Sequence, residues 1–186
     1  MVCQGRKNKH PEFKLSLRPM VLNNFYRYFL GELAQLYDAN EATAIALMMF
    51  EERSGFTKHS IITKPDMTLE SNLQQQLTED LARLTTGEPV QYVLGYTWFS
   101  GQRFSVSPAV LIPRPETEEL VQEATETIQK KSFKTLLDVG TGSGCIPISI
   151  KLQVSKTIIT AIDISKDALQ IAEKNAHDLS AAVNFI

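Results

Sequence analysis

The stretch Thr135–Ile150, TLLDVGTGSGCIPISI, decides how the second half of this chain folds. Its first residues, up to Asp138, are β-branched residues and leucines, which predicts a buried parallel strand. Glycines at positions 140, 142 and 144 permit a sharp turn, and the isoleucines beyond them fall on a helix. We therefore predict a strand, a glycine turn and a helix N-terminus, with several backbone N–H groups left unpaired for an anionic or polar ligand group.

A second strand is predicted at Thr157–Ile162, and it ends in Asp163, about nineteen residues beyond Gly144. A carboxylate at the carboxyl end of such a strand can accept both hydroxyls of a ribose. The loop spacing is G-x-G-x-G rather than G-x-G-x-x-G, which disfavours a nicotinamide-dependent dehydrogenase. Two strand-end acids that bracket one glycine loop resemble the first two motifs of Rossmann-like S-adenosylmethionine-dependent methyltransferases. The alternative is a tight βαβ turn that binds no ligand.

Composition narrows the class of protein. With 186 residues, 43% hydrophobic and 22% charged, the chain has room for one large domain or two small ones. Its net charge of −2 argues against a general nucleic-acid binder. Residues 1–20 form a basic polar tail without the apolar core of a secretory signal, and no stretch approaches the length of a membrane span, so we expect no membrane association.

The cysteines and histidines predict neither a disulfide nor a metal site. Cys3 and Cys145 are far apart in the sequence, which indicates a reducing compartment and hence a cytoplasmic location. The three histidines are scattered, so no zinc site can be built from them. We expect Cys145 to pack behind the glycine loop rather than to act as a nucleophile.

Three helices are predicted in the first half of the chain. Apolar residues recur at helical spacing from Leu22 to Tyr37, and a second helix, Glu41–Arg53, is expected to be capped by Asn40. A third begins at Thr68, carries a stripe of leucines and ends at Gly87. We therefore interpret residues 21–90 as a helical bundle domain.

The remaining elements complete the predicted fold class, α plus α/β. Alternating apolar residues in 91–107 predict a β-hairpin linker around Ser100-Gly101. Residues 108–186 then hold a helix that ends near Lys131, the two strands, a helix capped by Ser165 and the start of a third strand. By its resemblance to that class, this last segment is expected to form the first part of a Rossmann-like methyltransferase domain.

Three stretches together resemble one family. They are GEPVQY with Gly95 at 87–95, FSVSP followed by LIPRPETE at 104–118, and DVGTGSG at 138–144. In this order and spacing they resemble the protein-glutamine N5-methyltransferases that modify peptide chain release factors, the PrmC or HemK family. The resemblance implies a helical N-terminal domain that helps to hold the release factor, a hairpin linker, and a catalytic domain that methylates the glutamine of a Gly-Gly-Gln loop.

The resemblance also implies the residues of a cofactor site for S-adenosylmethionine. Asp163 would take the ribose, Asp138 would help to hold the methionine end, and Arg114–Glu118 would border the active site. No residue of this sequence is assigned a catalytic role. The residues expected to wrap the methionine part are Gly140, Thr141, Gly142, Ser143 and Gly144.

The family's Asn-Pro-Pro-Tyr motif, which receives the substrate amide, does not occur in these 186 residues. We therefore expect the front part of a longer enzyme, a monomer that by itself transfers no methyl group and binds S-adenosylmethionine weakly or not at all. Two alternatives remain. One is a DNA adenine-N6 methyltransferase, which shares a related acceptor motif but is disfavoured by the acidic body of the chain. The other is a non-catalytic release-factor-binding fragment.

Overall fold

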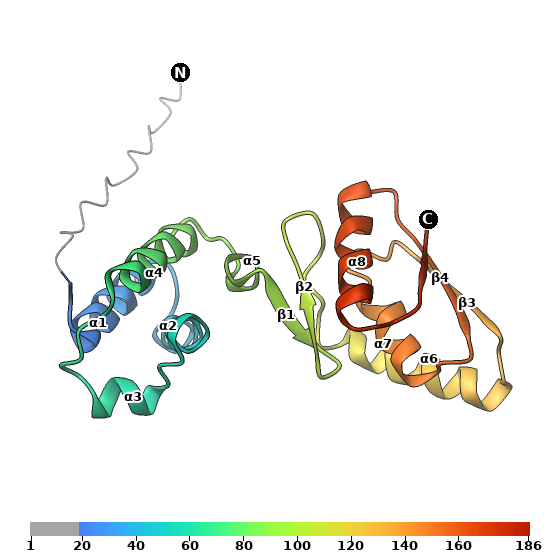
Figure 1. The fold of residues 1–186 in the computed structure, drawn as a ribbon, viewed down its shortest axis with the longest axis horizontal. Coiled ribbons are helices and arrows are strands. Elements are labelled where there is room, and N and C mark those ends of the chain that lie inside the picture. Colours follow the sequence, from blue (N-terminus) through green and yellow to red (C-terminus); the bar gives the residue numbers. More distant parts are fainter. Residues whose placement is uncertain (1–18) are drawn as a thin grey trace, which may run out of the picture. The chain divides into compact units, whose positions relative to one another are not determined.

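The computed structural model describes residues 19–186, which form two compact units that divide between Ala82 and Arg83 (Figure 1). No helix in this described part of the chain has both the length and the apolar character needed to cross a bilayer. The elements, in order, are α1 Leu22–Leu33, α2 Ala39–Ser54, α3 Lys58–Thr63, α4 Ser71–Leu84, α5 Val90–Leu94, β1 Tyr96–Phe99, β2 Gln102–Ser105, α6 Thr117–Lys131, β3 Thr135–Val139, α7 Cys145–Gln153, β4 Ile158–Ile162, α8 Lys166–Asp178 and β5 Asn184–Phe185.

The first unit is a helical bundle around an aromatic cluster. Phe50 of α2 lies edge-on to Phe29 of α1, with ring centroids 5.4 Å apart, and 6.1 Å from Phe25. Leu77 and Leu81 of α4 are fully buried as well. These side chains lie at the helical spacing seen in the sequence, and the predicted helical N-terminal region is confirmed.

Two helix starts in this unit differ from prediction. The N-cap of α2 is Asp38 rather than Asn40. Asp38 Oδ1 accepts hydrogen bonds from the amides of Asn40 and Glu41, at 2.8 and 2.9 Å. The helix α4 starts at Ser71, three residues after the predicted Thr68, because Thr68 forms an antiparallel bridge with Val21. Side-chain capping and strand pairing thus override the apolar spacing at these two ends.

The second unit opens with the short helix α5 where an extended segment was predicted to begin. Pro89 precedes this helix and Gly95 follows it with φ +83°, and the Gly95 amide donates to Gln91 O at 2.8 Å. Proline before and glycine after a helix are its ordinary boundaries, and this signal outweighs the short alternation in the sequence. The predicted hairpin follows as β1 and β2, joined at Ser100-Gly101.

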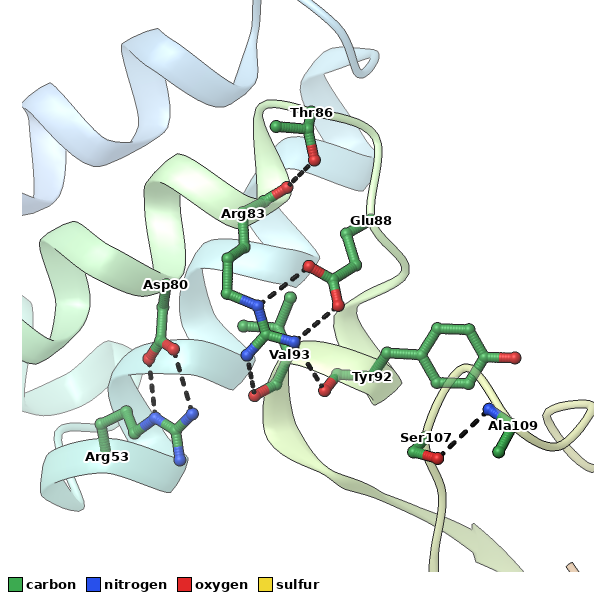
Figure 2. Close-up of polar contacts among 9 residues, drawn as sticks. All are labelled: Arg53, Asp80, Arg83, Thr86, Glu88, Tyr92, Val93, Ser107 and Ala109. Carbon is green, nitrogen blue, oxygen red and sulfur yellow. Dashed lines mark hydrogen bonds and ion pairs between the residues drawn. The ribbon is translucent and has the colours of Figure 1, made fainter. Parts of the chain in front are cut away.

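Arg83 holds the carboxyl end of α5. Its guanidinium donates to the carbonyls of Tyr92 and Val93 at 3.1 and 3.4 Å, and Glu88 accepts from its Nε at 2.9 Å (Figure 2). A cation at the negative end of a helix satisfies carbonyls that have no partner inside the helix. Arg83 therefore stabilises the turn that leads into the hairpin.

The hairpin packs into the core of the second unit rather than standing apart as a linker. Phe99 and Phe104 are fully buried, with their rings in a T-shaped arrangement 6.0 Å apart. The same cluster contains apolar residues of α6 and α7. The amide of Ser100 at the hairpin turn donates to Glu118 Oε1 of α6 at 2.8 Å. The hairpin is thus fixed against the helices that flank the sheet.

The sheet of this unit has the parallel order β3-β4-β5. Ile159 and Ala161 of β4 are buried on the face that the helices cover, and α7 and α8 lie on that side in Figure 1. Val139 pairs with Ile162 at the carboxyl ends of β3 and β4. The loops that follow these two strands therefore emerge at one edge of the sheet.

Candidate functional site

The glycine loop, residues 140–144, lies against the carboxyl end of β4. Its first two amides both donate to the carbonyl of Ile162, at 2.8 and 3.1 Å, and the third, that of Gly142, donates to Asp163 Oδ2 at 2.8 Å. The loop is thus bonded to the next strand rather than left free. This brings the two predicted strand ends, β3 with its loop and β4 with Asp163, into direct contact.

Most amides of the loop itself have acceptors, so the unpaired amides expected at the helix N-terminus do not lie along the first residues of the loop. The amide of Gly144 also has a partner, Thr141 O at 2.9 Å. Within residues 19–186, the amide of Ser143 is the one in this loop that has no hydrogen-bond acceptor. The backbone turns so tightly that carbonyls and a carboxylate come within reach of the amides, which sequence spacing alone does not reveal.

Asp163 is a charged and well-supported carboxylate. Its Oδ1 accepts from the amide of Ser165 at 2.9 Å, while Oδ2 accepts from Gly142. These backbone hydrogen bonds, from Ser165 first and Gly142 second, lower the pKa of the Asp163 carboxyl. Because an ionised carboxylate oxygen can accept more than one hydrogen bond, each oxygen keeps capacity for a ligand donor.

The pKa of the Asp138 carboxyl is shifted in the opposite direction. Burial raises the pKa of its carboxyl, the nearby Thr141 hydroxyl opposes the shift, and the negative charge of Asp163 adds to it. Asp138 Oδ2 and Thr141 Oγ1 are both buried, and although the Thr141 hydroxyl is near enough to oppose the pKa shift, neither atom makes a hydrogen bond of regular geometry in the described part of the chain. Orphaned buried polar atoms are unfavourable, so this pair fits a site completed by a ligand donor.

The three glycines have different surroundings. A Cβ at Gly140 or at Gly142 would meet no atom within 4 Å, so open space lies over both positions. A Cβ at Gly144 would lie 2.9 Å from Ile148 Cδ1 and 3.1 Å from Ala172 Cβ, so Gly144 is required where α7 packs on α8.

The seven predicted site residues thus fall into two groups, those at the edge of the sheet and those that are buried. Four lie at the open edge of the sheet or beside it: Asp138, Gly140, Gly142 and Asp163. The side chains of Thr141 and Ser143 are buried, and Gly144 lies between two helices.

Two residues at the site were missed in the sequence. Ile164, directly after Asp163, is fully exposed and gives the edge an apolar surface. Asn175 of α8 is 1% exposed and donates to the carbonyl of Ser143 in the glycine loop at 2.9 Å. Its signal was available, because Asn175 falls on the buried stripe that otherwise consists of alanines, and a buried amide must find partners.

Cys145, the first residue of α7, is a packing residue. It is buried against the core of the second unit, and this burial raises the pKa of its thiol to about 11. A thiol with such a pKa is protonated at neutral pH, and the protonated form is a poor nucleophile.

Comparisons with known proteins agree with this arrangement. Residues 27–95 match the model of the PrmC N-terminal domain, and residues 119–186 match that of the methyltransferase small domain. The release factor glutamine methyltransferase of Bacteroides thetaiotaomicron is 38% identical over 164 residues, covering 88% of this chain and 58% of the relative. That of Koribacter versatilis is 46% identical over 125 residues, covering 67% of this chain and 45% of the relative.

Over both matched regions the chain is similar to the release factor glutamine methyltransferases. A third relative with this name, from Flavobacterium psychrophilum, is 36% identical over 170 residues, covering 90% of this chain and 60% of that relative. The chain therefore spans between 45% and 60% of the length of these three relatives. Among solved structures, a tRNA (uracil-54, C5)-methyltransferase of Pyrococcus abyssi in complex with S-adenosyl-L-homocysteine aligns with a TM-score of 0.41 at 16% identity, covering 49% of this chain and 22% of that one.

Proposed function

We propose that S-adenosylmethionine binds at the open edge of the sheet formed by the carboxyl ends of β3 and β4 and the loops that follow them. This site would be part of an enzyme that methylates a glutamine of a peptide chain release factor. The observation that carries this proposal is the pair Asp138 and Asp163, which lie at the carboxyl ends of adjacent parallel strands beside the glycine loop. Ligands of open α/β sheets bind at this edge of the sheet.

Each side chain at the edge has a suitable role. Asp163, ionised and held by two amides, accepts the two ribose hydroxyls. Asp138 Oδ2, which has no partner of its own in the described residues, accepts from the α-ammonium of the methionine part. Ile164 offers an exposed apolar surface to the adenine ring. Open space over Gly140 and Gly142 lets the ligand approach the backbone closely.

The chemistry follows from the cofactor and the acceptor. S-adenosylmethionine supplies a methyl group on a positively charged sulfur. A glutamine amide nitrogen is a poor nucleophile because its lone pair is delocalised, so the enzyme's main task is to align that nitrogen with the methyl group. Alignment of this kind is worth roughly 7 to 11 kcal/mol in favourable cases. In this proposal, the residues of this chain hold the cofactor in a fixed position.

The release factor is proposed as the partner because the matched relatives are named release factor glutamine methyltransferases. In this proposal residues 21–90 form the substrate-recognition domain, and the Gly-Gly-Gln loop of the release factor supplies the glutamine. Titration of the 186-residue chain with a release factor tests this part. Binding that disappears when residues 21–90 are deleted supports it, and binding that survives the deletion contradicts it.

Calorimetric titration with S-adenosylmethionine tests the cofactor site. Asp163→Ala should weaken binding by roughly 1 to 3 kcal/mol, because a charged acceptor is lost. Asp167→Ala is the matched control, since it removes an exposed carboxylate from the first turn of α8 and should change binding by less than about 0.5 kcal/mol.

Two ligands that differ only in one ribose hydroxyl can separate the proposed ribose contact of Asp163 from its hydrogen bond to the glycine loop. Asp163 also bonds Gly142, so its loss affects the loop whether or not a ribose is bound. The original chain should therefore bind S-adenosylhomocysteine more tightly than its 2′-deoxy analogue, and Asp163→Ala should bind both equally. Equal discrimination by both proteins would remove Asp163 from the ribose.

A further inference from the structure

Asn175 stands out among the buried polar residues of the second unit because its side chain joins three elements. It lies on α8, is 1% exposed, and follows Ala168 and Ala172 on the buried stripe of that helix. A buried carboxamide has two N–H donors and one carbonyl acceptor to satisfy. All three find backbone partners outside α8.

The first two partners belong to the hairpin. Asn175 Oδ1 accepts from the amide of Ser105 at 2.7 Å, and its Nδ2 donates to the carbonyl of the same residue at 3.0 Å. Ser105 is the last residue of β2. The carboxamide therefore bonds both backbone groups of Ser105, as a neighbouring strand would.

The third partner belongs to the glycine loop. Nδ2 also donates to Ser143 O at 2.9 Å. The preceding residue, Gly142, is bonded from the other side by Asp163 of β4. Adjacent loop residues are thus held by two side chains, one after a strand and one on a helix. The second of these also holds the hairpin.

We propose that Asn175 is a positioning residue, which couples the hairpin to the glycine loop and thereby sets the shape of the open edge at Gly140 and Gly142. The identity of the ligand affected rests on the function proposed above. The coupling itself is a property of the ligand-free chain. Displacement of the hairpin is transmitted to Ser143 through one rigid side chain, and ordering of the loop by a ligand in turn orders the hairpin.

Replacement of Asn175 by alanine tests the coupling. Asn175→Ala leaves the amide and carbonyl of Ser105 and the carbonyl of Ser143 without these partners. Amide hydrogen exchange in the ligand-free chain should then become about tenfold faster in both the hairpin and the glycine loop. Affinity for S-adenosylmethionine should fall about tenfold, because the loop must be ordered on binding.

Two control variants separate positioning from general stability. Lys174→Ala removes the neighbouring contact of Lys174 Nζ with Ser105 Oγ, 2.7 Å long, and leaves every bond to the loop in place. It should not change exchange in residues 140–144. Val121→Ala truncates a buried side chain of the same core, so it lowers stability without touching the coupling.

The pattern of exchange decides the question. The coupling is supported if amide exchange in the hairpin and the glycine loop is faster in Asn175→Ala than in Val121→Ala. In that case the two variants should protect the amides of β4 equally. An unchanged loop, or an increase shared evenly with β4, overturns it. Absence of S-adenosylmethionine binding would concern the proposed cofactor site, and the exchange result in the ligand-free chain would still decide whether Asn175 couples the two elements.

Discussion

At the scale of single residues, Asp138 shows how a site can be unfavourable until its ligand is present. Its carboxyl is partly buried beside Asp163, and its Oδ2 accepts no hydrogen bond in the described structure. The raised pKa means that the folded chain binds this proton more tightly than the unfolded chain does. The contribution of Asp138 to stability is therefore present at acidic pH and is lost as the pH rises through the folded-state pKa.

We expect Asp138→Asn to raise the thermal unfolding midpoint of the ligand-free chain at neutral pH, because a poorly solvated charge is removed. The gain should shrink on acidification, where Asp138 itself becomes neutral. The same variant should bind S-adenosylmethionine about tenfold more weakly, since the ammonium loses a charged partner. Unfolding curves at neutral and acidic pH, with Asp167→Asn as control, check the sign. A lower midpoint at neutral pH would contradict this description of Asp138.

At the scale of elements, the glycine loop has two separate requirements. Gly140 and Gly142 face open space, whereas Gly144 lets α7 pack closely on α8. We predict that Gly144→Ala destabilises the second unit by about 2 to 4 kcal/mol, from the clash with Ile148 and Ala172 and from its φ of +76°. Gly140→Ala should cost only about 1 to 2 kcal/mol, because its φ is also positive but its Cβ meets nothing.

A double-mutant cycle isolates the helix contact. Ala172→Gly removes the Cβ that lies 3.1 Å from the new methyl group at position 144. Combined with Gly144→Ala, it should recover part of the lost stability in chemical denaturation, giving a favourable coupling energy of about 0.5 to 2 kcal/mol. Strict additivity would show that Ala172 adds nothing to the cost of Gly144→Ala, which would then come from the contact with Ile148 and from the backbone.

The order of the longer elements was predictable from the sequence, whereas the short helices α3 and α5 and the detailed ends and partners of the others were not. Apolar periodicity depends on which face is buried, and it located the three long helices of the first unit and the strands that flank the glycine loop. The cap at Asp38 and the short helix α5 depend on local hydrogen bonds and on proline and glycine boundaries, which compete with that pattern. The paired amides of the loop and the bonds of Asn175 depend on residues distant in sequence, so spacing could indicate the loop but not its contacts.

At the scale of the whole molecule, each unit has its own core and its own internal polar contacts. In the first unit, Arg53 of α2 and Asp80 of α4 form a two-pronged ion pair, with Nε–Oδ2 and Nη2–Oδ1 distances of 2.7 and 3.1 Å (Figure 2). Asp80 is 5% exposed. Planar pairs of this kind are stronger than single surface contacts, and their loss leaves a charge poorly solvated.

Asp80→Ala should therefore destabilise the first unit by about 1 to 3 kcal/mol, with little effect on S-adenosylmethionine binding by the second. Hydrogen exchange should show loss of protection in α1, α2 and α4 but not in the sheet β3-β4-β5. The neighbouring variant Glu79→Ala, which removes an exposed carboxylate bonded to Gln75, serves as control and should change neither unit. Equal loss of protection in both units would show that they do not behave as separate cores.

The carboxyl ends of β3 and β4 are proposed to hold S-adenosylmethionine. Backbone amide spectra of the isotope-labelled chain, recorded during titration with the cofactor, test this site because they locate even weak binding. We predict concentration-dependent shifts at Gly140, Gly142, Asp163 and Ile164, with the helices of the first unit unchanged. Saturating shifts elsewhere, or no shifts at these four amides at millimolar cofactor, would contradict this position of the cofactor.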